Sequence, residues 1–125
     1  MIIAGVGCRR GASASEIAAA ITAALAARKL AANALGLIAT AKAKADEPGI
    51  SAVAASLGVR LVLVPQDALT AASPRAITKS ERVQELIGVP SVAEAAALAA
   101  GGPNTRLLAP RIVVGPVTCA LGEVP

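Results

Sequence analysis

The chain has 125 residues, of which 55% are hydrophobic, 16% are charged and none is aromatic, and its net charge is +4. So apolar a chain is globular and not disordered. No aliphatic run reaches the roughly 20 residues of a membrane span, and no basic segment precedes Ile2 as it would in a signal peptide. We therefore predict a single cytoplasmic domain over residues 1–125 that does not contact a membrane.

The charge pattern limits the partners. The basic residues are dispersed, and no aromatic side chain is available to stack on bases, so nucleic acid is not a predicted partner. A polycarboxylate or phosphorylated small molecule fits the positive excess better. With no histidine, and with Cys8 and Cys119 far apart in sequence, we predict no metal site and no bound cofactor.

The chain begins with the pattern of a strand, a glycine-rich turn and a helix start. Gly5, Gly7 and Gly11 supply a backbone that turns tightly and allows close approach of a ligand. Ser13 and Glu16 form a capping box that opens a helix.

Arg9 and Arg10 lie between these glycines and the helix start, where free amides and the positive end of the helix dipole favour an anion. This arrangement predicts an anion-binding turn, and the alternative is a plain turn with solvated arginines. Cys8 has the same two interpretations: its basic surroundings favour a reactive thiolate, but without a histidine base a small packing residue is the better explanation.

Helix and strand patterns then alternate along the chain. The predicted elements are a helix over 13–29, a strand over 35–40, a helix from the Asp46 cap to Gly58, a strand over 61–64 covered on both faces, a short helix after Pro65, a loop over 72–79, a helix over 80–87, a helix from a second capping box at Ser91 and Glu94 to Gly101, and two strands over 107–114 and 117–124. The two-residue connection Gly115-Pro116 predicts a hairpin. This order indicates an α/β domain: a three-layer α/β/α sandwich with a mixed, mostly parallel sheet and a C-terminal antiparallel hairpin.

Two further observations bear on ligands. Lys44 follows the second predicted strand, at the sheet edge where α/β folds bind ligands. Asp46 and Glu47 are candidate polar contacts there, although a helix cap explains both. The Gly5-x-Gly7 pattern also permits a dinucleotide site, with Lys42 meeting a 2′-phosphate, but the third glycine comes one residue late.

Four stretches in order resemble the cobalamin biosynthesis CobE/CbiG family, that is, the C-terminal domain of cobalt-precorrin-5A hydrolase and its stand-alone relatives. They are Gly-Val-Gly-Cys-Arg-Arg-Gly at 5–11 with the helix start at 13–17, Lys-Ala-Asp-Glu-Pro-Gly at 44–49, Gly-Val-Pro-Ser-Val-Ala-Glu-Ala-Ala-Ala-Leu at 88–98, and Val-Thr at 117–118. The sequence departs from the family at Lys42, where an acidic residue is common, and at Ile112 and Val113, where polar or basic residues are common.

The resemblance implies binding of a precorrin, an anionic tetrapyrrole, by the stand-alone form of the domain. It also implies assistance in opening the ring A lactone with loss of the extruded carbon, so the protein is either an enzyme or a carrier. The alternatives are an NADP(H)-binding oxidoreductase subunit and a non-catalytic adaptor of another pathway enzyme. Homo-oligomers and complexes with other cobalamin-pathway enzymes are also expected.

Carboxylates around an apolar macrocycle suit the cations and helix amides found above. No catalytic residue is assigned. The predicted ligand-binding residues are Gly7, Cys8, Arg9, Arg10, Gly11, Ser13, Lys44, Asp46, Glu47, Ser91 and Thr118.

Overall fold

A computed structural model describes residues 1–81 and 89–125. The predicted helix over 80–87 therefore lies, beyond its first two residues, outside the described residues. The helices and strands are β1 (Ile2–Cys8), α1 (Ala14–Ala27), η1 (Ala32–Ala34), β2 (Leu35–Ala41), η2 (Lys42–Lys44), α2 (Pro48–Leu57), β3 (Arg60–Val64), α3 (Gln66–Ala72), η3 (Ser73–Arg75), α5 (Val92–Gly101), β4 (Arg106–Leu107), β5 (Ile112–Val114) and β6 (Val117–Glu123). No helix among these is long and apolar enough to cross a bilayer.

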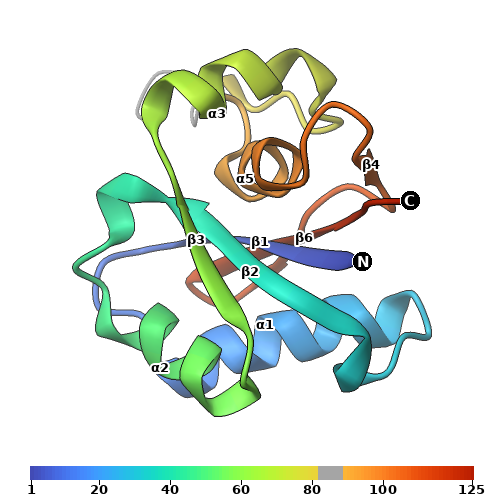
Figure 1. The fold of residues 1–125 in the computed structure, drawn as a ribbon. Helices are drawn as coiled ribbons and strands as arrows, with labels where there is room; N and C mark the ends of the chain where they lie inside the picture. Colours follow the sequence, from blue (N-terminus) through green and yellow to red (C-terminus); the bar gives the residue numbers. More distant parts are fainter. Residues whose placement is uncertain (82–88) are drawn as a thin grey trace.

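A mixed sheet forms the middle layer, in the order β3-β2-β1-β6-β4, with β5 also paired to β6. Strands β1, β2 and β3 are parallel, whereas β6 is antiparallel to β1, β4 and β5. Helices α1 and α2 cover one face, and α3 and α5 cover the other (Figure 1). The predicted α/β/α architecture with a mixed sheet and C-terminal antiparallel strands is confirmed.

The third strand differs from its prediction. We expected both faces of residues 61–64 to be covered, but β3 is the edge strand of the described sheet and Leu63 is 38% exposed. An aliphatic run alone does not distinguish a central strand from an edge strand, because both are rich in the same side chains.

The predicted strand over 107–114 is interrupted. Leu107 pairs with Gly122 and Ile112 pairs with Cys119. Ile112 is thus five residues after Leu107, whereas their partners in β6 are only three residues apart. Two residues are therefore extra, and they form a bulge. Pro110 lies in it and has no N–H for a ladder hydrogen bond. The hairpin between β5 and β6 is confirmed, with Gly115 at φ 57° in its turn.

The helix caps show which local signals hold. The Ser13 capping box forms in full, since Glu16 N donates to Ser13 Oγ at 3.1 Å and Ser13 N donates to Glu16 Oε1 at 2.9 Å. The Asp46 cap is wrong: Glu47 is the N-cap of α2, without a side-chain cap, and Pro48 begins the helix. Gly58 ends α2 in the left-handed conformation, as predicted.

Glycines in β1 allow α5 to pack directly on the sheet. A Cβ at Gly5 would lie 1.9 Å from Ala93 O, and a Cβ at Gly7 would lie 2.7 Å from Thr118 Oγ1. The expectation that both glycines belong to a turn is wrong, because they lie in β1 beneath an alanine-rich helix. Gly11, at φ 81°, belongs to the turn that follows.

Candidate functional site

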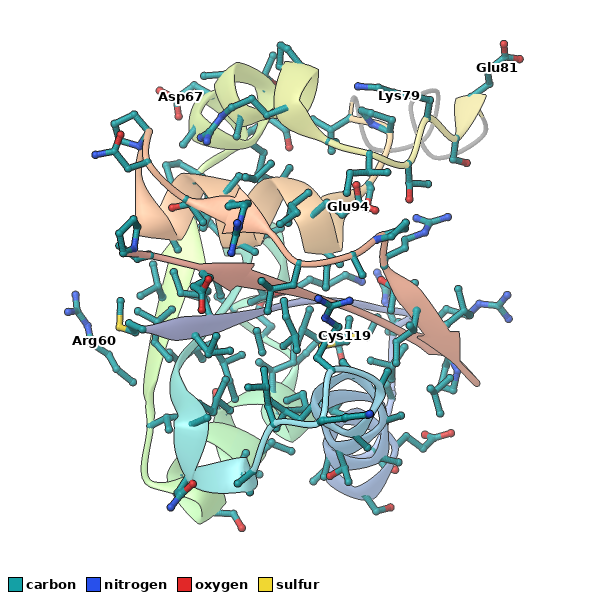
Figure 2. All side chains as sticks on the ribbon, turned by 90° about the vertical axis from the view of Figure 1, so that its right-hand side faces the viewer. Arg60, Asp67, Lys79, Glu81, Glu94 and Cys119 are labelled. Atoms are coloured by element: carbon teal, nitrogen blue, oxygen red, sulfur yellow. The ribbon has the colours of Figure 1, made fainter. Side chains whose placement is uncertain are left out.

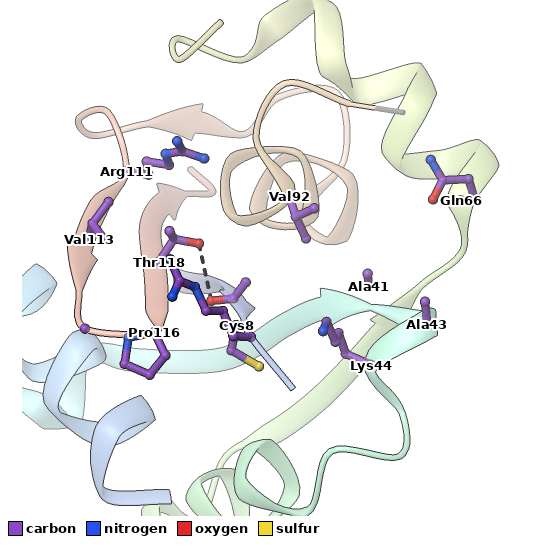
Figure 3. A pocket seen from close by; sticks show the side chains of 13 residues that line it. Cys8, Ala41, Ala43, Lys44, Gln66, Val92, Arg111, Val113, Pro116 and Thr118 are labelled. Carbon is purple, nitrogen blue, oxygen red and sulfur yellow. Dashed lines mark hydrogen bonds between the residues drawn. The ribbon is translucent and has the colours of Figure 1, made fainter. Parts of the chain in front are cut away.

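A cleft of about 320 Å³ opens at the carboxyl ends of β1 and β2 (Figure 3). There β1 lies between β2 and β6. The chain passes from β1 to β2 through α1 on one face of the sheet, and it comes to β6 after α3 and α5 on the other face. Open α/β sheets bind ligands at such a position. The cleft is lined by Gly7, Cys8, Arg9, Ala41, Ala43, Lys44, Gln66, Val92, Arg111, Val113, Gly115, Pro116 and Thr118.

Five of the predicted ligand-binding residues line this cleft together: Gly7, Cys8, Arg9, Lys44 and Thr118. They come from the end of β1, from η2 and from β6. Thr118 Oγ1 donates to Gly7 O at 3.3 Å, which joins β6 to β1 at the base of the cleft (Figure 3).

Three others surround the start of α1 outside the lining. Gly11 N donates to Glu47 Oε2 at 3.1 Å, so a carboxylate of the protein already occupies that amide. The side chain of Ser13 is used by its capping box.

The remaining three also lie outside the lining. Arg10 and Asp46 are exposed. Ser91 is fully buried, and its hydroxyl accepts from Glu94 N at 3.3 Å, where it caps α5.

The helix that begins at the cleft is α5, through Val92, and not α1. Residues far from the first turn therefore complete the site. Lys44 and Thr118 are among the predicted residues, whereas Val92 and Arg111 are not.

Arg111 is the charged lining residue that the sequence reasoning missed. The signal available was the Pro110-Arg111 pair, which interrupts an aliphatic strand pattern. Only the bulge opposite β6 brings Arg111 to the cleft. Figure 3 shows Arg111 and Lys44 on opposite sides of the opening, with Val92 between them in the view.

Apolar side chains make up most of the remaining wall. Ala41 and Ala43 lie on the side of Lys44, and Val113 and Pro116 lie on the side of Arg111 (Figure 3). Three cations around aliphatic walls suit a ligand with an apolar body and acidic substituents. Among the described residues, no group of three or more His, Cys, Asp or Glu side chains is arranged to hold a metal ion.

The Cys8 thiol is not activated. Burial raises its pKa, the positive charge of Lys44 lowers it by less, and the negative charge of Glu47 raises it further. Of the two interpretations of Cys8, this direction favours the packing residue over the reactive thiolate, because Cys8 ends a strand and is half-buried, so that burial outweighs its basic surroundings. The thiol is therefore protonated at neutral pH. Burial also raises the pKa of the Cys119 thiol, to about 12.

The second predicted capping box forms only in part. Ser91 caps α5, but the Glu94 carboxylate does not return to the Ser91 amide. It accepts instead from the Ile77 and Thr78 amides, the Thr78 hydroxyl and the Arg111 amide. Burial works to raise the pKa of this carboxyl, but these hydrogen bonds outweigh it and the pKa is lowered.

A family model described as "Cobalamin synthesis G C-terminus" matches residues 2–122. The chain belongs to this family. The CobE/CbiG resemblance drawn from the sequence is thereby confirmed, and the chain is a cobalamin biosynthesis protein of that family.

Three relatives show how far the likeness extends. Protein CobE of a Sinorhizobium species is 35% identical over 120 residues, which cover 96% of this chain and 78% of that protein. The crystal structure of CobE, a protein from the cobalamin (vitamin B12) biosynthetic pathway, superposes with a TM-score of 0.93 at 31% identity and covers 100% of this chain and 91% of that one. Cobalamin biosynthesis protein chiG from Agrobacterium tumefaciens is 43% identical, with a TM-score of 0.79, over 99% of this chain and 98% of that one.

Proposed function

We propose that the protein binds a precorrin-like tetrapyrrole intermediate of cobalamin synthesis in the cleft at the carboxyl ends of β1 and β2. The observation that carries this proposal is the lining itself, in which Arg9, Lys44 and Arg111 surround aliphatic walls. Early intermediates of the pathway are apolar macrocycles with acetate and propionate side chains. Arginine binds such carboxylates bidentately, and lysine binds them as a point charge.

Holding the intermediate is the role we propose. The Cys8 thiol is protonated, and the chain contains no histidine that could activate water or a nucleophile. We therefore assign no catalytic residue, and opening of the ring A lactone stays a prediction from the family resemblance. A stand-alone domain in the cytoplasm, acting alone, as a homo-oligomer or with another pathway enzyme, also stays a prediction.

Titration of the purified protein with uroporphyrin tests the proposal. Uroporphyrin carries eight acetate and propionate groups on a tetrapyrrole, and its own absorbance and fluorescence report binding, which suits a chain without aromatic residues. We expect saturable binding that weakens as salt rises, because ions screen the attraction. NADPH is the comparison ligand, for which we expect no saturable binding. Saturable NADPH binding without uroporphyrin binding would favour the oxidoreductase alternative.

Deletion of the gene in a host that makes cobalamin aerobically tests the role in cells. We expect lower cobalamin output and an accumulated intermediate, both reversed by the wild-type gene. A gene carrying Arg9→Ala together with Arg111→Ala should restore less. Undiminished output in the deletion strain would contradict a role for the protein in the pathway.

A further inference from the structure

Glu94 is a buried carboxylate that joins three segments far apart in the sequence. Its side chain is fully buried in the first turn of α5, in the layer above the sheet (Figure 2). Its Oε1 accepts from Ile77 N at 2.6 Å and from Thr78 N at 2.8 Å. Its Oε2 accepts from Thr78 Oγ1 and, at 2.9 Å, from Arg111 N.

The same Ser-x-x-Glu motif has two different outcomes in this chain. Glu16 is exposed and closes its own capping box on Ser13. Glu94 occupies the equivalent position in α5 but leaves its box open. Helix capping therefore does not account for the buried carboxylate. A buried charge is costly unless it is fully hydrogen-bonded, and here the donors come from the Ile77–Thr78 segment and the Arg111 segment.

The hydrogen bond from Arg111 N links Glu94 to a residue that lines the cleft. Arg111 lies in the bulge after Pro110, where the ladder to β6 is interrupted. Its N–H is donated to Glu94 rather than to the sheet. The side chain of the same residue lines the cleft, as does Val92, two residues before Glu94 on α5.

We propose that Glu94 is a positioning residue: its carboxylate holds the Arg111 bulge against α5 and so sets where the Arg111 guanidinium stands in the cleft. The test of this inference by ligand affinity rests on the proposed function, because it requires that the cleft bind a tetrapyrrole. Glu94 is fully buried and is not among the residues that line the cleft, so we assign it no contact with the ligand.

The substitution Glu94→Gln tests this role without changing any residue that lines the cleft. Glutamine keeps the shape and one carbonyl oxygen, which can accept from the Ile77 and Thr78 amides. Its NH₂ group then faces the Arg111 N–H, and two donors cannot bond to each other. The variant thus releases the bulge while retaining most of the other contacts.

A double-mutant cycle with Arg111→Ala reads out the coupling through uroporphyrin affinity. We expect Glu94→Gln and Arg111→Ala each to weaken binding by about tenfold, and the double variant to be within about twofold of Arg111→Ala alone. Glu94→Gln combined with Arg9→Ala should instead multiply the two losses. Glu16→Gln is the matched control, since it makes the same chemical change at an exposed cap, and it should leave affinity unchanged.

Losses that multiply for Glu94→Gln with Arg111→Ala would overturn the proposal, because Glu94 would then affect binding independently of the Arg111 side chain. Unchanged affinity in Glu94→Gln would overturn it as well. If Glu94→Gln does not fold, Glu94→Asp keeps the charge but is one methylene shorter, and the same non-additivity is expected of it.

Amide hydrogen exchange of Arg111 in the ligand-free protein gives an independent readout. We expect this amide to be protected in the wild type and in Glu16→Gln, and to exchange faster in Glu94→Gln. A wild type that fails to bind uroporphyrin but shows this pattern would remove the proposed function and keep the positioning role. An unprotected Arg111 amide in the wild type would remove the positioning role itself.

Discussion

At the scale of single residues, adjacent cations differ in their relation to the cleft. Arg9 lines it, whereas Arg10 is exposed outside the lining. Neighbouring residues in a turn seldom point the same way. The sequence predicts that both arginines bind the ligand, but only Arg9 lines the cleft.

Replacing Arg9 by alanine should weaken uroporphyrin binding by about tenfold to a hundredfold, since a charge-assisted hydrogen bond contributes about 1.5–3 kcal/mol. The melting temperature should change little, because Arg9 is exposed. Arg10→Ala is the matched control and should bind as the wild type does. Equal affinities of the wild type and the Arg9→Ala, Arg10→Ala double variant at low salt would show that this turn is not part of the site.

Cys8 should behave as a packing residue. Because its thiol is protonated at neutral pH, we expect iodoacetamide to alkylate it slowly at pH 7.5 and faster as the pH approaches its raised pKa. Cys8→Ser should lower the free energy of unfolding by about 1 kcal/mol and leave uroporphyrin affinity unchanged. Rapid alkylation at pH 7, or loss of binding in Cys8→Ser without loss of fold, would point to a reactive thiol.

Glu94 should make stability depend on acidity. Burial works to raise the pKa of its carboxyl, but the hydrogen bonds from Thr78, Arg111 and Ile77 outweigh burial and lower the pKa from its ordinary value of 4.5. Its stabilising effect is therefore complete above that pH and is lost as the pH falls through the folded-state pKa. We expect the wild type to exceed Glu94→Gln by about 1–3 kcal/mol of unfolding free energy between pH 5 and 7. Urea unfolding at a series of pH values should show this difference shrinking below about pH 4, whereas a difference that does not vary with pH would contradict the assignment.

At the scale of elements, the contact between α5 and β1 depends on a missing side chain. An alanine at Gly5 would place its Cβ 1.9 Å from Ala93 O, so helix and strand would have to separate. Gly5→Ala should destabilise the protein by about 1–3 kcal/mol or more in urea unfolding. Gly36→Ala is the control, because its Cβ would meet the flexible Met1 side chain, and its cost should be much smaller. Equal costs would mean that α5 can shift away from β1 freely.

At the scale of the whole molecule, the two ends of the chain lie together. Met1 N donates to Val124 O at 2.9 Å, and Val124 N donates to Met1 O at 2.9 Å. The exposed turn at Lys29 lies between α1 and η1, on the side where β2 begins, whereas the cleft lies where β2 ends.

A circular permutant that joins residue 125 to residue 1 through a short linker and opens the chain after Lys29 should fold, because termini that lie close tolerate such joining. We expect its uroporphyrin affinity to be within about twofold of the wild type, since every lining residue keeps its neighbours. Circular dichroism and the titration check this. A permutant opened between Arg9 and Arg10 is the contrasting design, and it should lose affinity. Loss of affinity in both permutants would mean that chain order, not cleft geometry, governs binding.

Many features of this protein are determined by residues that are close together in the sequence. The Ser13 capping box, Pro48 at the start of α2, Gly58 at its end and the Gly115-Pro116 hairpin depend on residues within a few positions of one another, so the sequence predicts them directly. The family motifs are equally local stretches of sequence, so they indicate the family before the fold is known.

Only the tertiary structure decides which residues meet at the cleft. The local pattern predicts that Gly5 and Gly7 form a turn, but in the structure they lie in a strand against α5, almost 90 residues later. Arg111 reaches the cleft through a bulge that is defined only by the register of β6. Glu94 reads as a cap until its partners at Ile77 and Arg111 are brought to it. These are contacts between segments far apart in sequence, and neither helical periodicity nor capping carries information about them, because both describe only neighbours along the chain.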